Sequence, residues 1–497
     1  MLLLAIMSTI AVLLVYFSFF TAIIFSASCI ILMFILIYKK QGGVFIFCGV
    51  LLLLTVLSAS FKMSEIDRIE QLGGMTVSGE FICVEKASVS DGLSITAEVK
   101  ECEYLKARDR VLLYYEGPEI LEGQSFKGVV ELKKFSNKIQ LNYYSECVFL
   151  KGDLSKIVLT SDNDFILSGI SRVKAYIKTA IFDGFGREGA ATMLALLTGD
   201  KSYFSDTFYN NVKAAGVAHV MVVSGMHLAI IVSFLTYFLN KLFYNRYLKA
   251  LIIFITVIAI FAVCGFTMSM LRAGITYILI SLALLLNRQS KSENNLGTAV
   301  SIILLFNPLI IFNVAFQLSV LSTFGILVVA IPIIEFITQN EIIKLRPLSA
   351  LTSSVIISIS ALLFTLPITI SIFGYVSNMA VLTNLLISLP TTAAICLCIA
   401  GLIIPPLRPI AFYIANLIIG YVNFVINSFG GVSFATSNLP KWALILSIIA
   451  IFLILFGLLA CANQNNMLKL KGILNKKIKE GGGKRKWQSL MKKRLKM

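Results

Sequence analysis

The sequence predicts a polytopic α-helical membrane protein of about 12 spans that carries a small β-rich, OB-like extracytoplasmic domain. Of its 497 residues, 58% are hydrophobic and 14% are charged, and the mean hydropathy is +0.88. A soluble domain carries about a quarter charged residues. Apolar runs of about 20 residues recur along the chain, and each is long enough to cross a bilayer as a helix. One polar segment, 61–165, interrupts them with alternating apolar and polar residues.

The first 60 residues predict three transmembrane helices, at 1–18, 20–38 and 43–60. Lys39 and Lys40 separate the second helix from the third, and positive charge favours the cytoplasmic side. The third helix therefore exits, and the N-terminus lies in the cytoplasm. The apolar stretch is too long for a cleavable signal peptide, so we expect these helices to be retained.

The polar segment 61–165 predicts a small antiparallel barrel or sandwich. Short runs alternate apolar and polar residues at 75–81, 93–99 and 111–115, and turn signals follow at Asp91-Gly92, Gly117-Pro118 and Glu122-Gly123. Alternation of this period is typical of strands with one buried face, and turns about every ten residues are typical of barrels. Five or six strands of an OB-like barrel fit this length.

The charge of this segment bears on its role. OB folds often bind single strands through a basic, aromatic face. Here 13 Lys and Arg residues stand against 18 Asp and Glu residues, a net charge of −5. This balance argues against a strong phosphate contact, so a structural or gating role is supported at least as well. If the segment is outside, its cysteines, Cys83, Cys102 and Cys147, allow one disulfide, and the sequence does not choose the pair.

The remaining chain predicts interfacial helices, a transmembrane core and a tail. Within 166–216, Ile170–Phe182 mixes basic and apolar residues as an amphipathic interfacial helix does. The core, 217–462, contains nine predicted spans, at about 217–239, 247–265, 268–287, 297–312, 313–337, 349–373, 379–404, 409–429 and 441–462. Proline is expected to break several, at Asn307-Pro308, Pro332, Pro367, Pro390 and Pro405-Pro406. Broken helices are tolerated where they line a cavity or face other protein.

The tail, 463–497, holds most of the excess positive charge. It contains 12 Lys and Arg residues and one Glu, which is +11 of the formal +17. A cytoplasmic anchor that binds anionic lipid explains this charge better than a nucleic-acid arm does. The basic loops between the core spans fall on the same side as the tail.

The two histidines of the chain, His219 and His227, are the first candidates for function. If one helix carries both, they lie about 80° apart on it. Ionisable residues in a span are costly and mark functional sites, although hydrogen-bonded structural roles explain these two equally well. Ser224, three residues before His227, also fits a serine nucleophile, but neighbours on one helix seldom form that contact. Metal-binding motifs are absent from the sequence, so we expect no metal or cofactor.

Other polar residues lie within predicted spans. Arg272 begins a span, where it faces a phosphate-bearing path or snorkels to the interface. Gln317, Asn378 and Asn384 are uncharged donors that join helices or line a pore.

Several motifs occur in a characteristic order. They are Leu-Leu-Thr-Gly-Asp at 196–200, Ala-Gly-Val-Ala-His at 215–219, Val-Ser-Gly-Met-His-Leu at 223–228, Met-Leu-Arg-Ala-Gly at 270–274, Asn-Pro-Leu at 307–309, Phe-Gln-Leu-Ser at 316–319, Leu-Pro-Ile at 366–368 and Asn-Met-Ala-Val-Leu-Thr-Asn at 378–384. This pattern resembles the ComEC competence family over residues 190 to about 430. The resemblance implies a bacterial plasma-membrane channel that admits single-stranded DNA during natural transformation. It places Asp200, His219, Ser224, His227 and Arg272 near the strand's path.

The chain departs from longer members of that family, which resemble nucleases at the C-terminus. No histidine follows His227, so this chain cannot hold the zinc site of their metallo-β-lactamase-like domain. We therefore expect a translocation channel and not an enzyme. A separate nuclease, a DNA receptor and a cytoplasmic motor are its expected partners, because the sequence has no Walker-type phosphate loop. The alternative is a membrane transporter or intramembrane hydrolase that reuses the scaffold, although the inverted repeats common in transporters are not visible.

Overall fold

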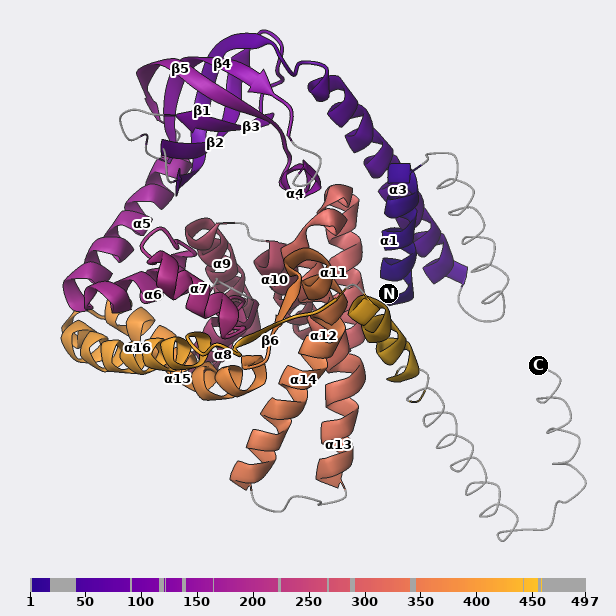
Figure 1. The fold of residues 1–497 in the computed structure, drawn as a ribbon, viewed down its shortest axis with the longest axis vertical. Helices are drawn as coiled ribbons and strands as arrows, with labels where there is room; N and C mark the ends of the chain where they lie inside the picture. Colours follow the sequence, from indigo (N-terminus) through magenta and orange to yellow (C-terminus); the bar gives the residue numbers. More distant parts are fainter. Residues whose placement is uncertain are drawn as a thin grey trace, which may run out of the picture.

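The computed structural model shows a β-barrel at one end of a helical body (Figure 1). It describes residues 2–17, 42–89, 92–115, 120, 122–135, 140–163, 165–221, 225–265, 268–286, 291–339, 346–440, 442–454 and 457. The predicted span at 20–38, Lys39, Lys40, Ser224 and the basic tail at 463–497 lie outside the described residues.

Five strands close the barrel in the order β1-β2-β3-β5-β4. They are β1 (Thr76–Val89), β2 (Gly92–Cys102), β3 (Arg110–Tyr115), β4 (Gln124–Lys133) and β5 (Val148–Asn163). The alternation in the sequence arises because one face of each strand fills the barrel, where Phe81, Ile95 and Phe126 are fully buried. The predicted barrel is confirmed.

The expectation of a purely antiparallel barrel was wrong for one pair of strands. β3 and β5 are parallel, while the other pairs in the barrel are antiparallel. The chain crosses from β3 to β4, which pairs with β1, and then returns as β5 to fill the gap between β3 and β4. Closure of the barrel thus requires a pairing between strands that do not follow one another in sequence.

The three cysteines of the barrel are free thiols in the structure. In the ladder between β1 and β2, Cys83 pairs with Ala97, whereas Cys102 pairs with Gly79. Four residues of offset on a strand is roughly 13 Å, and a disulfide needs Cα atoms within about 7 Å. A bond between Cys83 and Cys102 is therefore excluded by register, and Cys147 instead lies with its sulfur 3.7 Å from Nδ2 of Asn307.

A long helix, α3 (Gly42–Glu70), joins the barrel to the helical body. Its 29 residues span about 43 Å. Ile66 and Ile69, near its end, are buried in the core of the barrel. Leu52 and Val56 lie more than two helical turns before Ile66, and they are buried against α1 (Leu2–Phe17) and α11 (Ser292–Phe306). In Figure 1, α3 rises along one side of the molecule and α5 (Phe165–Gly184) descends along the other.

Five helical segments among the described residues are long and apolar enough to cross a membrane. They are α9 (Arg246–Cys264), Val314–Gln339, most of α14 (Arg346–Phe373), α15 (Ala380–Ile403), and Pro405–Gly430, which includes α16 (Arg408–Gly430). Shorter apolar helices lie within α8 (Gly225–Leu242) and α10 (Met268–Leu285) and at Trp442–Ile454. The apolar outer faces fit a lipid environment: Leu251, Ile255 and Ile258 of α9 are exposed on one side of that helix. The chain is a membrane protein, and the count of about 12 spans stays a prediction.

The prolines break fewer helices than expected. α11 ends before Asn307-Pro308, and α15 ends before Pro405-Pro406, as predicted. Pro367 and Pro390, in contrast, lie inside continuous helices. Membrane helices tolerate proline where neighbours satisfy the freed backbone groups. Pro332 is the second residue of α13 (Ile331–Gln339), which continues from α12 (Val314–Gly325) through a π-helical turn, η2 (Ile326–Ala330), so the proline does not end the helix.

Three helices connect the barrel to α8. α5 is longer than the predicted amphipathic segment at 170–182, and α6 (Arg187–Thr198) and α7 (Asp206–Ala214) follow it. All three pack against α16, where Ile181 of α5, Leu194 of α6 and Val212 of α7 share a buried cluster with Ile419.

Candidate functional site

Three motifs that are far apart in the sequence meet where α8, α10 and α12 pack together. A Cβ added at Gly225, the first residue of α8, would lie 2.8 Å from Cβ of Ala273. Glycine therefore lets α8 approach α10 closely. The same position lies 3.5 Å from Nη2 of Arg272, so the guanidinium sits beside the first turn of α8.

A serine pair fixes Arg272 in this position. Its Nε donates to Oγ of Ser319 on α12 at 2.9 Å, and Oγ of Ser269 donates to the same oxygen at 3.0 Å. Within the described part of the chain, Arg272 donates only through Nε, and its two terminal nitrogens keep their donors available. A guanidinium with spare donors in an apolar bundle is suited to bind an anion, above all a phosphate.

The two histidines do not share a helix, contrary to the sequence prediction. His219 lies in a turn with an exposed side chain, whereas His227 is on α8 and only 1% exposed. The chain reverses after α7 because Gly216 adopts a left-handed conformation, with φ of 74°. A Cβ there would lie 2.6 Å from Cβ of Ala380, so the turn is also closely packed against α15.

The two predicted asparagines on or before α15 differ in role. Nδ2 of Asn378 donates to the carbonyl of Phe434 and to Oγ of Ser437, both at 2.8 Å, and so joins the end of β6 (Tyr375–Ser377) to the start of β7 (Thr436–Asn438). The side-chain oxygen of Asn384 is buried and has no hydrogen-bond partner among the described residues, and the same holds for Oγ1 of Thr391. These two residues are two helical turns apart, which places them on one face of α15.

Gln317 belongs to a connection between the barrel and the core. Its Nε2 donates to the carbonyl of Ile311 at 2.7 Å within the 3₁₀ turn η1 (Pro308–Phe312). Nδ2 of Asn313 donates to Oγ of Ser145 at 3.0 Å, and Nδ2 of Asn307 donates to the carbonyl of Ser145 at 2.7 Å. Ser145 ends the short helix α4 (Gln140–Ser145), which precedes β5. The motif that begins with Asn307 therefore docks the barrel on the core, a role that the sequence did not reveal.

Asp200 shapes a loop between α6 and α7. Its Oδ1 accepts from the backbone N–H of Ser202 at 2.9 Å and from the Ser202 hydroxyl at 2.6 Å. The adjacent Lys201 is half-buried. Burial, together with the positive charge of Lys213, lowers the pKa of the Lys201 amine. Sequence reasoning selected Asp200 and missed the two lysines.

The backbone of α7 at Asn211 packs closely against the backbone of α16 at Gly430. Nδ2 of Asn211 donates to Oδ1 of Asn427 at 3.0 Å. A Cβ at Gly430 would lie 2.3 Å from the carbonyl oxygen of Asn211 and 2.8 Å from its Cα. Backbone atoms cannot rotate away, so any side chain at 430 must displace α7.

We expect Gly430→Ala to lower the free energy of unfolding by about 1–3 kcal/mol, as overpacking does. Thermal unfolding of the detergent-solubilised protein measures this change. Gly420→Ala on the same helix is the matched control, because a Cβ there meets nothing within 4 Å. Equal melting temperatures of the two variants would contradict the close approach at Gly430.

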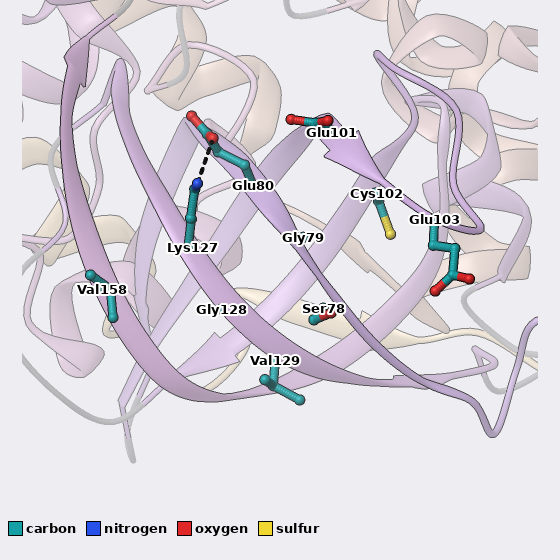
Figure 2. Close-up of a pocket in the computed structure, with 10 residues that line it drawn as sticks. All are labelled: Ser78, Gly79, Glu80, Glu101, Cys102, Glu103, Lys127, Gly128, Val129 and Val158. Carbon is teal, nitrogen blue, oxygen red and sulfur yellow. Dashed lines mark ion pairs between the residues drawn. The ribbon is translucent and has the colours of Figure 1, made fainter.

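A groove of about 610 Å³ crosses the outer wall of the barrel. It exists because Gly79 and Gly128 pair across β1 and β4 and leave no side chain there. Figure 2 shows Glu80 paired with Lys127, at 3.6 Å, and Glu101 nearby. With Glu103 the lining holds three carboxylates and one amine. This charge repels phosphate, as the net charge of the segment predicted. Among the described residues, no group of three or more His, Cys, Asp or Glu side chains is placed to hold a metal ion.

Comparisons with known proteins agree with the motif order. The family model described as "Competence protein" matches residues 196–464, more than half of the chain. The ComE operon protein 3 of Bacillus subtilis is 26% identical over 192 residues, which cover 39% of this chain and 23% of that protein. An uncharacterized protein of Mycoplasma pneumoniae, the MG316 homolog, is 25% identical over 216 residues, which cover 44% of this chain and 51% of that protein. The chain thus aligns with about half of one relative's length and less of the other's. No solved structure matches the chain.

Proposed function

Because the chain belongs to the competence protein family, we propose that it forms a plasma-membrane channel that imports single-stranded DNA during natural transformation. The family and the relative from a ComE operon support a role in DNA uptake. That the protein is itself a channel, that it carries a single strand and that the strand moves inward are parts of this proposal.

The observation that carries the proposal is the meeting of Gly225, Arg272 and Ser319 inside the helical core. A passage for DNA through an apolar bundle needs donors that replace the hydration of each phosphate. Arg272 supplies them with its terminal guanidinium nitrogens. Among the described residues, Oδ1 of Asn384 and Oγ1 of Thr391 are buried without a hydrogen-bond partner, and polar groups inside a membrane helix are costly unless they serve a function.

The barrel is proposed to be an OB-like domain with a structural or gating role. Its five strands and its order, with β3 parallel to β5, support the OB-like assignment. Its acidic groove argues against a strong phosphate contact. Two firm connections, through α3 and through Asn313, favour a domain that holds a fixed place over the core.

We further propose that the protein itself performs translocation and no hydrolysis. A separate nuclease would then degrade the second strand, and a DNA receptor and a cytoplasmic motor would supply and pull the strand. Both termini are proposed to be cytoplasmic, with the basic tail on anionic lipid.

The test is uptake of labelled DNA in a transformable host that lacks its own channel and carries this chain, with the host nuclease retained. We expect the chain to restore uptake and His227→Ala, which alters a buried residue of α8, to reduce it at least fivefold. Tyr244→Ser is the control, because Tyr244 is fully exposed in the loop after α8. Confirmed membrane insertion without any uptake, even with the nuclease supplied, would contradict the proposal.

A further inference from the structure

Lysines lie beside aromatic rings on α5, in the loop between α6 and α7, and on α7. Nζ of Lys213 lies 3.9 Å from the centre of the Tyr209 ring, and Nζ of Lys178 lies 5.0 Å from the centre of the Tyr203 ring. Lys201 lies two residues before Tyr203, in the loop between α6 and α7. Proteins that hold single strands without sequence preference combine basic groups with rings on which bases stack.

The packing of α7 on α16 sets the position of Tyr209 and Lys213. Val212 is 1% exposed, and Asn211 bonds to Asn427 of α16. Tyr209 and Lys213 are one helical turn apart, and both lie about 160–200° around the helix from Asn211. The contact with α16 therefore leaves Tyr209 and Lys213 on the opposite side of α7, where both are half-buried.

The carboxylates of the same loop do not neutralise these lysines. Neither Lys201 nor Lys213 forms a salt bridge with a described residue. Asp200 accepts two hydrogen bonds from Ser202. Asp206 lies in the first turn of α7, where the helix dipole stabilises its charge. The positive charge of Lys213 lowers the pKa of the Lys201 amine. An anion bound near both amines would offset this repulsion.

We propose that Lys201 and Lys213, with the rings of Tyr203 and Tyr209, form a contact site for a single DNA strand at the extracytoplasmic mouth of the channel. The amines bind phosphates, and the rings stack with bases. This site rests on the proposed function. It places the contact with DNA phosphates on the α6–α7 segment, because the acidic groove of the barrel disfavours such a contact.

The test is binding of fluorescent oligothymidylate to the purified full chain in nanodiscs, followed by fluorescence anisotropy over a range of salt concentrations. We expect the double variant Lys201→Gln/Lys213→Gln to bind at least tenfold more weakly. Because two phosphate contacts are lost, the slope of log affinity against log salt should fall by about 1.4. Lys201→Arg/Lys213→Arg should keep both the affinity and the slope.

Two further variants separate charge from stacking. Tyr209→Leu should weaken binding of oligothymidylate about tenfold but leave binding of inorganic polyphosphate, which has no bases, unchanged. Lys127→Gln, in the barrel groove, is the matched control and should bind oligothymidylate no more weakly than the unaltered protein. Melting temperatures confirm that each variant is folded.

The outcomes distinguish the site from the function. If the unaltered protein binds oligothymidylate and the folded double lysine variant binds it equally well, the site is wrong while the channel remains supported. If Lys127→Gln weakens binding and the double variant does not, the barrel is the contact surface and the proposed site is overturned. Failure of the unaltered protein to bind any single strand would count against both the site and the channel.

Discussion

Replacing Arg272 with glutamine is expected to reduce DNA uptake by about 10–100-fold. A hydrogen bond to a charged group contributes about 1.5–3 kcal/mol, and each 1.4 kcal/mol is about a tenfold change in rate. Glutamine keeps a polar side chain near Ser319 but removes the positive charge and the forked donors that a passing phosphate needs. The measurement is uptake of labelled DNA per molecule of folded, membrane-inserted protein.

Three related variants make this prediction specific. Arg272→Lys keeps the charge without the planar fork, so it should recover part of the uptake. Ser319→Ala removes the hydroxyl that accepts from Nε of Arg272 and should cause a smaller loss than Arg272→Gln, because the charge remains. A purely structural Arg272 would behave differently: Arg272→Gln would lower the amount of folded protein, but uptake per folded molecule would stay unchanged. That result would remove Arg272 from the path.

The sequence predicted the barrel because the alternation of apolar and polar residues that marks a strand can be recognised within each strand alone. The run at 93–99 alternates strictly, and the structure buries Ile95 and Ala97 while turning their neighbours outward. The parallel pairing of β3 with β5 could not be predicted in the same way. It joins strands that are separated by β4 and α4, and neither strand carries a signal for its distant partner.

Helix continuity was harder to predict than helix position. Proline removes a hydrogen-bond donor wherever it occurs, so the sequence gives Pro308 and Pro367 the same weight. The structure separates them through their surroundings. Pro308 begins a 3₁₀ turn that packs against α4, whereas Pro367 lies within α14, where Thr365 and Thr369 donate to nearby backbone carbonyls.

The candidate site was predicted only in part. The motif that contains Arg272 was recognised, and the structure brings it to Gly225 and Ser319. Asp200 was selected because it is an acidic residue within a motif, yet its carboxylate bonds to its own loop. The adjacent Lys201 gave no signal alone, because a single lysine in a loop is normally solvated. The available signal was a pair of lysines, Lys201 and Lys213, that enclose four aromatic residues at 203, 204, 208 and 209.

Replacing Asn313 with alanine is expected to lower the free energy of unfolding by about 2–4 kcal/mol. Asn313 is 3% exposed and serves two elements at once. Its Oδ1 accepts from the backbone N–H of Phe316 at 3.1 Å and caps α12. Its Nδ2 donates to Oγ of Ser145 at 3.0 Å and thereby holds the barrel. Thermal unfolding in detergent measures the total loss.

Asn313→Asp separates the two roles. A carboxylate still caps α12, and a negative charge is favourable at a helix N-terminus. It cannot donate to Ser145, however, and it places a second negative charge near Glu146, whose Oε1 lies 3.4 Å from Nδ2 of Asn313. We therefore expect hydrogen exchange to accelerate in α4 and η1 while α12 stays protected. Ser145→Ala combined with each variant completes a double-mutant cycle, in which a coupling energy near zero would contradict the docking bond. If Asn313→Asp leaves α4 as protected as in the unaltered protein, the other connections, among them α3 and the bond from Asn307 to Ser145, hold the barrel without Asn313.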